Sequence, residues 1–273
     1  MIWLPLIILA LVQGLTEFLP VSSSGHLVLV HAAMDGTREL AERRTLDVAV
    51  HVGTLLSVLV YFRSDVLTMI KGALSWLSGD FTSDKARLPL YILAGSLPVI
   101  AAGFVLHKIE PSWLALVEVM AWATIIFGIV LWIADRMGAK TKTLTDMNFK
   151  DAVMVGCAQV LALIPGTSRS GITMTAGRFL GYTRTESAHF SLLLSIVAIA
   201  GAGTLAGLDI YQSGNTELGL EAFIAAALSF IAGWVSIALM MRWLEKSTFT
   251  PFAIYRVILG IILLSLIYSG SWA

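Results

Sequence analysis

The chain has few charged residues and a single cysteine, and both shortages restrict its class. Only 13% of its 273 residues are charged and 57% are hydrophobic, whereas ordinary soluble domains carry roughly 25% charged residues. This composition predicts an integral membrane protein. Cys157 alone excludes an intrachain disulfide and a thiolate metal cluster, and we expect it to be a small core residue. The formal net charge is zero, so nothing indicates a nucleic-acid partner.

Six apolar stretches are long enough for spanning helices, which need about 20 predominantly apolar residues. They cover approximately 46–63, 88–107, 113–134, 188–208, 220–243 and 251–270. Two further apolar regions, about 2–33 and 152–181, are interrupted near the middle by Pro, Gly and Ser. Each half is too short for a span, which predicts a helical hairpin that enters the membrane and turns back.

The order of these segments predicts two repeats of one architecture. A re-entrant hairpin followed by three spans occurs twice, in about 1–135 and about 150–273, within a single membrane domain over 1–273. Three spans are an odd number, so the second repeat must enter from the opposite face. The predicted fold class is an all-α polytopic membrane protein with two inverted-topology repeats, whose hairpin tips meet inside the membrane.

Basic residues between the spans assign the two faces. The larger group should be cytoplasmic, because cytoplasmic loops carry an excess of Lys and Arg. The larger group is Arg63, Lys71, Lys85, Arg87, Arg136, Lys140, Lys142, Lys150, Arg184, Arg242 and Lys246, and the smaller is Arg38, Arg43, Arg44 and Lys108. Both termini and the 34–45 loop then face outward, and 135–151 is expected to be a solvated cytoplasmic loop.

Two segments that lie 146 residues apart place polar groups inside apolar sequence. Residues 13–26 read QGLTEFLPVSSSGH and residues 159–172 read QVLALIPGTSRSGI, so that Gln, Leu, Ser, Ser and Gly coincide. The first segment adds a carboxylate and an imidazole, and the second adds a guanidinium. We therefore predict that two halves build one site.

Arg169 is the costliest of these groups, because a charge at membrane depth costs about 2.5–3.5 kcal/mol on insertion scales. Small and hydroxyl-bearing residues surround it, and the start of the following helix can bind an anion. A guanidinium in that setting predicts a phosphate cradle. Its members are Gly166, Ser168, Arg169, Ser170 and Thr173. Alternatively, Arg169 pairs with Glu17 as a buried link between the repeats, and the two interpretations are compatible.

Glu17 and Gln13 lie one helical turn apart and face the same way. A carboxylate among Leu, Phe and Pro needs a cation, either Arg169 or a divalent metal that bridges it to a phosphate. His26 follows the serine run 22–24, and serine beside an imidazole is the minimum for nucleophilic or acid–base phosphoryl chemistry. A histidine near a helix start can equally be a capped structural residue.

Other ionisable residues are weaker candidates. His51 shares an apolar span with Asp47. It either supports the site residues or has a packing role, and we expect the second. Arg178 and Arg256 either face the site or extend toward the cytoplasmic surface. We expect the second, as long basic side chains near span ends do.

These residues resemble the undecaprenyl-pyrophosphate phosphatase family, the bacterial enzymes linked to bacitracin resistance. The family's Glu/Gln-x-x-x-Glu motif is matched by Gln13 and Glu17, and its Pro-Gly-x-Ser-Arg-Ser-x-x-Thr motif by residues 165–173. The run PFAIYR over 251–256 also looks like that family, and the likeness covers nearly the whole chain. Gln13 is a departure, because many relatives have Glu there, and it leaves Glu17 as the main acidic group.

The resemblance implies hydrolysis of undecaprenyl pyrophosphate to the monophosphate carrier lipid and inorganic phosphate. This reaction recycles the lipid for peptidoglycan synthesis and confers bacitracin resistance. The resemblance also implies a site open to the periplasmic side of the bacterial cytoplasmic membrane, and dependence on Mg²⁺ or Ca²⁺.

We hypothesise a role for each site residue from the motifs and the resemblance together. Arg169 binds the pyrophosphate, and Glu17 holds the metal with Gln13 assisting. Ser23 attacks the terminal phosphorus or positions the water that does, with His26 as acid–base or nucleophile partner. The other substrate-binding residues are Ser22, Ser24, Gly166, Ser168, Ser170 and Thr173.

A lipid-phosphate flippase with the same cradle is the strongest alternative, because inverted repeats with broken helices are typical of secondary transporters. A membrane scaffold without a site is a third class. Small-residue faces such as Ala94-Gly95 permit a homodimer, but they serve internal packing equally well.

Overall fold

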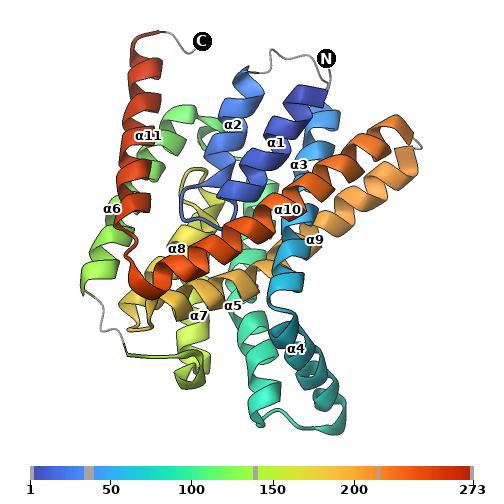
Figure 1. Ribbon diagram of the computed structural model, residues 1–273, viewed down its shortest axis with the longest axis vertical. Coiled ribbons are helices and arrows are strands. Elements are labelled where there is room, and N and C mark those ends of the chain that lie inside the picture. The colour runs from blue at the N-terminus through green and yellow to red at the C-terminus, as the bar shows by residue number, and fades with distance from the viewer. Residues whose placement is uncertain (1–2, 34–39, 138–140, 214–215, 271–273) are drawn as a thin grey trace.

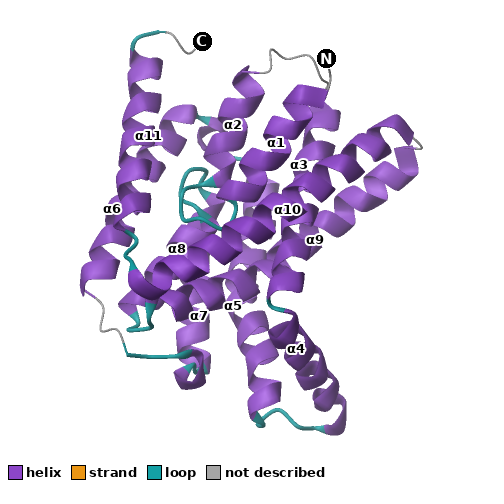
Figure 2. Cartoon of the chain, viewed as in Figure 1, coloured by secondary structure: helices purple, strands orange, loops and turns teal. Residues whose placement is uncertain are grey.

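The computed structural model describes residues 3–33, 40–137, 141–213 and 216–270. Within these ranges every regular element is a helix, apart from one bridge between Lys142 and Tyr182 (Figure 2). Helices long and apolar enough to cross a membrane are Asp84–Ile109, Val117–Met137, Leu218–Lys246 and Thr250–Tyr268, with a bent pair, Thr45–Tyr61 and Arg63–Ser78, as a further candidate. The prediction of an all-α polytopic membrane protein is confirmed at this level.

The first half of the chain begins with a short helical hairpin. Its helices α1 (Trp3–Thr16) and α2 (Ser23–Ala33) have 14 and 11 residues, too few for a span. The chain then bends by 87° between Thr45–Tyr61 and Arg63–Ser78, which ends the expected 46–63 span. The remaining helices of this half are α3 (Leu40–Tyr61), α4 (Arg63–Ser75), α5 (Asp84–Ile109) and α6 (Val117–Met137).

The second half begins with another short hairpin. Its helices α7 (Phe149–Gln159) and α8 (Arg169–Phe179) have 11 residues each, and a 3₁₀ turn, Val160–Leu163, extends α7. The three remaining spans expected from sequence all fall in helices. These are α9 (Arg184–Ser213), α10 (Thr216–Lys246) and α11 (Thr250–Tyr268).

The two hairpins approach each other from opposite ends of the molecule (Figure 1). Helices α1 and α2 lie at the end where α11 finishes, whereas α7 extends toward the opposite end. Their turns touch, because Ser170 Oγ donates a hydrogen bond to the carbonyl oxygen of Leu19 at 3.1 Å. Polar groups from both hairpins therefore meet inside the helical assembly.

Small residues let the helices beside the hairpins approach closely. A Cβ on Gly53 of α3 would lie 2.1 Å from the carbonyl oxygen of Ala226 in α10. Likewise, a Cβ on Gly156 of α7 would lie 2.3 Å from the carbonyl oxygen of Gly95 in α5. Any side chain at these positions would push the helices apart. The packing role predicted for Ala94-Gly95 is thus confirmed within one copy of the chain.

Two arginines that were expected to reach the membrane surface are buried instead. Arg178 and Arg256 are each 0% exposed. Arg178 Nε donates to Asp135 Oδ1 at 3.1 Å, and Arg184 Nε donates to the same oxygen at 2.7 Å. The 135–151 segment, expected to be a solvated loop, therefore starts with a buried carboxylate. An opposite charge offsets the cost of burying Arg178, and this partner joins α6 to α8 and α9.

Cys157 is exposed on α7, so the prediction of a core position was wrong. The buried face of this helix carries Ala152, Val155 and Gly156, and the helical period turns the neighbouring Cys157 outward. Among the residues that assigned the two faces, Arg38, Lys140 and the side chain of Arg44 lie outside the described part of the chain, as do residues 34–39 of the 34–45 loop.

Candidate active site

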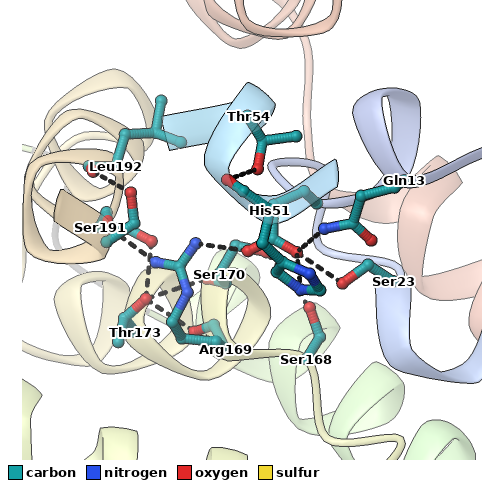
Figure 3. Close-up of polar contacts among 12 residues, drawn as sticks. Gln13, Ser23, His51, Thr54, Ser168, Arg169, Ser170, Thr173, Ser191 and Leu192 are labelled. Carbon is teal, nitrogen blue, oxygen red and sulfur yellow. Dashed lines mark hydrogen bonds and ion pairs between the residues drawn. The ribbon is translucent and has the colours of Figure 1, made fainter. Parts of the chain in front are cut away.

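Glu17 lies at the meeting point of the two hairpin turns and is only 8% exposed. Its Oε2 accepts hydrogen bonds from Ser23 Oγ at 2.7 Å and from Gln13 Nε2 at 2.9 Å. Its Oε1 accepts a hydrogen bond from Arg169 Nη2 at 3.1 Å. One carboxylate therefore joins α1 to the first residue of α2 and the first residue of α8. Its partners Gln13, Ser23 and Arg169 are labelled in Figure 3.

Each hairpin turn ends in a serine with left-handed backbone conformation. Ser22 has φ 72° and Ser168 has φ 68°, values that residues with a Cβ seldom adopt and that mark strained functional turns. Each serine Oγ lies 3.2 Å from the Oγ two residues later, on Ser24 and Ser170. Ser168 Oγ also caps α8 by accepting from the Gly171 amide at 3.1 Å. Since α2 and α8 begin directly after these turns, their positive N-terminal ends meet near Glu17 and favour an anion.

The Arg169 guanidinium is held between the two hairpins and α9. Nη1 donates to the carbonyl oxygen of Ser191 at 3.1 Å, while Nη2 binds Glu17. Thr173 Oγ1 supports this arrangement, lying 2.7 Å from Ser191 Oγ and donating to the Arg169 carbonyl at 2.8 Å. The buried Arg169–Glu17 link considered from sequence is thus present. The guanidinium side chain is still 16% exposed, so the link leaves it accessible to a ligand.

The loop that precedes α8 is held in place from α11. Arg256 Nη2 donates to the carbonyl oxygens of Gly166 at 2.9 Å and Thr167 at 2.8 Å, and Nε donates to that of Thr124 at 3.1 Å. Gly166 has φ 91°, and a Cβ there would lie 2.1 Å from the carbonyl oxygen of Met120, so the position requires glycine. Arg256 therefore positions the phosphate-cradle loop from inside the protein.

His26 binds its own turn and α11. Its Nδ1 lies 2.7 Å from the Ser22 carbonyl oxygen and its Nε2 lies 2.6 Å from the Tyr255 hydroxyl. The His26 and Tyr255 rings are also stacked, with centroids 5.7 Å apart. Both ring nitrogens are engaged with atoms other than Ser23 Oγ. Neighbouring residues of α11, Tyr255 and Arg256, thus contact the two hairpin turns.

His51 lies beside Glu17, which favours the supporting role at the site over the packing role that we expected. Its Nε2 lies 3.7 Å from Glu17 Oε2, and its Nδ1 lies 2.6 Å from the Asp47 carbonyl oxygen. Figure 3 shows His51 on α3 between Gln13 and Arg169. The one sequence signal was a histidine four residues after an aspartate inside an apolar span. Ser191 was missed entirely, because a serine among leucines in a span has no distinguishing pattern.

A metal at this place would need neutral ligands as well as acidic ones. In the described ranges, no three His, Cys, Asp or Glu side chains are grouped so that they could hold a metal ion. One neutral oxygen is suitably placed: Gln13 Oε1 is buried and no hydrogen-bond donor reaches it. An amide oxygen and a carboxylate are ligands that Mg²⁺ and Ca²⁺ accept, so Gln13 and Glu17 fit a hard divalent cation.

Comparison with known proteins connects this geometry to one family. Residues 6–262 match the family described as bacitracin resistance protein BacA. A protein of Ruegeria pomeroyi is 44% identical over 97% of this chain and 98% of its own, and one of Roseobacter denitrificans is 45% identical with the same coverage. A protein of Rhodospirillum rubrum is 44% identical over 99% of this chain and 97% of its own. The first two are named undecaprenyl-diphosphatase and the third undecaprenyl-diphosphatase 1. The chain therefore belongs to the bacitracin resistance protein BacA family.

Proposed function

We propose that this chain is an undecaprenyl-diphosphatase, which hydrolyses undecaprenyl pyrophosphate to undecaprenyl phosphate and inorganic phosphate. The observation that carries this proposal is the Glu17 carboxylate, bound by Ser23 on one oxygen and by Arg169 on the other. The Ser23 hydroxyl, the Glu17 carboxylate that can act as its base and the Arg169 guanidinium that can bind a phosphate therefore lie together in one buried site. The names of its relatives favour hydrolysis over the flippase alternative.

The pyrophosphate binds where the N-termini of α2 and α8 meet. Arg169 pairs with the terminal phosphate and stabilises the charge that develops during transfer, which is the main protein contribution to phosphoryl transfer. The other residues proposed to bind the substrate carry hydroxyls or, in one case, no side chain. They are Ser22, Ser24, Gly166, Ser168, Ser170 and Thr173. Since Ser191 and Thr173 hold the Arg169 side chain and backbone, the guanidinium is oriented before substrate arrives.

Ser23 is the nucleophile in this proposal, and Glu17 is its base. The Ser23 hydroxyl proton passes to Glu17 Oε2, to which it is already hydrogen-bonded at 2.7 Å. The Oγ–phosphorus bond forms as the bridging phosphorus–oxygen bond breaks, and undecaprenyl phosphate leaves. The proton on Glu17 passes to the departing undecaprenyl phosphate, which restores the carboxylate. Water then loses a proton to Glu17 and displaces Ser23 from phosphorus, and Glu17 returns that proton to Ser23 Oγ as inorganic phosphate is released. His26 fixes the serine turn through the Ser22 carbonyl oxygen.

A divalent cation, Mg²⁺ or Ca²⁺, is part of the proposal, with Glu17 and the amide oxygen of Gln13 as its protein ligands. Bound there, the cation would neutralise part of the phosphate charge. The orphaned, buried Gln13 Oε1 supports this assignment.

We place the protein in the bacterial cytoplasmic membrane, with the site open to the periplasmic side. The lipid product then re-enters peptidoglycan synthesis, and its recycling confers bacitracin resistance. Two inverted-topology repeats are supported by the opposed hairpins and by the left-handed Ser22 and Ser168, which lie 146 residues apart. A homodimer is also proposed. It would need a surface other than Gly53 and Gly95, which pack internally.

Phosphate release by the purified protein tests the function. Detergent-solubilised protein is given a polyprenyl pyrophosphate, and liberated phosphate is measured against time. Hydrolysis in detergent supports a phosphatase, because transport requires two compartments. If the protein releases no phosphate but moves the lipid across a sealed liposome, the proposal is wrong and the flippase is right.

A further inference from the structure

His51 faces the carboxylate of Glu17, but the nitrogen of its neutral ring on that side has no hydrogen to donate. Its Nδ1 lies 2.6 Å from the carbonyl oxygen of Asp47, and a carbonyl oxygen only accepts, so Nδ1 carries the ring hydrogen. The Nε2 of the neutral ring is then an acceptor. It lies 3.7 Å from Glu17 Oε2, which is also an acceptor. Either a proton on Nε2 or a cation between the two atoms makes this contact favourable.

The hydrogen bond to Asp47 is the support that metal-binding histidines usually have. Such histidines donate their second ring N–H to a backbone carbonyl or a carboxylate, which fixes the ring orientation and leaves the other nitrogen for the metal. The His51 side chain is 31% exposed, whereas that of Glu17 is 7% exposed. An ion can therefore reach the pair from the imidazole side.

Gln13 supplies the independent second observation. It is 0% exposed, and its Oε1 has no hydrogen-bond donor although its Nε2 binds Glu17 Oε2 at 2.9 Å. A buried acceptor without a partner is costly, and a cation would satisfy it. Arg169 binds Glu17 Oε1, whereas Oε2 faces His51 and accepts from Ser23 and from Gln13 Nε2. Rotation of the Gln13 amide brings its oxygen to the place of Nε2, beside Oε2, where a cation can bind both oxygens.

We infer that His51 Nε2 is a ligand of the divalent cation, together with Glu17 Oε2 and Gln13 Oε1. This inference rests on the cation of the proposed function and identifies its chemical class. A nitrogen ligand shifts a site toward transition-metal divalent ions, whereas Ca²⁺ takes oxygen ligands. The site should therefore bind Mn²⁺ in preference to Ca²⁺. Many relatives of the family carry Glu where this chain has the neutral Gln13. The His51 imidazole would supply an additional neutral ligand to the cation in this chain.

Nitrogen coupling to bound Mn²⁺ tests the inference without an activity assay. Mn²⁺ alone is added to the detergent-solubilised full chain, and electron spin echo modulation detects any ¹⁴N nucleus bound to the metal. We expect a histidine nitrogen signal in the unaltered protein and its loss in His51→Gln. Mn²⁺ affinity should fall in that variant by at least the roughly tenfold change seen when even a supporting partner of a ligand is removed, and its preference over Ca²⁺ should fall too.

His31→Gln is the matched control, because His31 Nε2 binds Asp47 Oδ1 at 2.8 Å rather than Glu17. It should keep the nitrogen signal. If His51→Gln does not fold, [¹⁵N]histidine labelling of the unaltered protein must change the coupling from ¹⁴N to ¹⁵N. Mn²⁺ binding without a histidine signal overturns the inference and leaves the oxygen-ligated cation intact. Absence of Mn²⁺ binding overturns both, while phosphate release separately decides the hydrolase.

Discussion

Ser23 and Arg169 bind opposite oxygens of the same carboxylate, and each is the first residue of the helix that follows a hairpin turn. They lie at the offset of 146 residues that aligns the two polar segments. The alignment thus pairs a hydroxyl in one half of the chain with a guanidinium in the other. Because Glu17 contacts both, its removal should affect activation of the hydroxyl and placement of the guanidinium together.

Glu17→Gln should reduce hydrolysis by about 100-fold or more, the lower range for loss of a general base. The amide keeps the size of the side chain and one acceptor oxygen, but it cannot take the Ser23 proton. Phosphate release is measured on protein that elutes as a single species in detergent. Glu110→Gln is the control, because Glu110 is 75% exposed and lies outside the site. Near-normal activity of Glu17→Gln would remove the base from the mechanism.

Ser23→Ala should abolish formation of a phosphorylated protein. The unaltered enzyme, mixed with substrate labelled with ³²P in the terminal phosphate and quenched in acid, should carry label that maps to Ser23. Ser64→Ala, which changes an exposed serine of α4, should keep the label. A Ser23→Ala enzyme with full turnover would instead indicate that water attacks phosphorus directly.

Arg169→Lys should be impaired although it retains the positive charge. Lysine cannot reproduce the planar fork by which Arg169 binds the Ser191 carbonyl and Glu17 together. We expect kcat to fall by about 100-fold, as when one transition-state donor is removed. Arg87→Lys, at a side chain 52% exposed, should behave as the unaltered enzyme. An Arg169→Lys variant that changes KM alone would show that the guanidinium serves ground-state binding only.

Arg256→Met should lower thermal stability and activity together. Methionine fills most of the buried volume but removes the guanidinium donor from the carbonyl oxygens of Gly166, Thr167 and Thr124. The Gly166 oxygen keeps a longer bond from Thr124 Oγ1 at 3.3 Å. Each unsatisfied buried group costs about 1–3 kcal/mol. Thermal unfolding in detergent measures the shift, and Arg242→Met, at an exposed position of α10, is the control. Unchanged stability would mean that the loop is held without Arg256.

Accessibility labelling should place the two ends of the molecule on opposite sides of the membrane. In a Cys157→Ala background, Ser269→Cys and Ser78→Cys introduce thiols at exposed positions after α11 and after α4. A membrane-impermeant maleimide applied to intact spheroplasts should label Cys at 269 and not at 78. Labelling of the 78 position alone would reverse the proposed orientation and open the site to the cytoplasm.

Much of the helical architecture could be read from local patterns. Runs of about 20 apolar residues predict spans wherever they occur, and the Pro, Gly and Ser interruptions marked both hairpins. The bend after Tyr61 was not foreseen, because neither Pro nor Gly marks it in the sequence. The inverted relationship of the repeats stays a prediction.

Buried charges were the least predictable feature. A single arginine near the end of a span predicts a side chain that extends to the membrane surface. In the structure, however, Arg178 binds Asp135 and Arg256 binds three backbone carbonyl oxygens. These partners lie far away in the chain, so no local pattern could indicate them. The role of His51 was undecided for the same reason, because Glu17 lies in the turn after α1 whereas His51 lies in α3.

The sequence by itself determined that this protein lies in a membrane, that two broken helical segments carry its polar groups, and which family it resembles. These properties follow from composition, run length and local motifs. Only the tertiary structure decided that Glu17 joins Ser23 to Arg169, that Arg256 holds the cradle loop and that His51 faces the carboxylate. Such contacts depend on helix packing, since groups from distant segments meet only after the helices that carry them have docked.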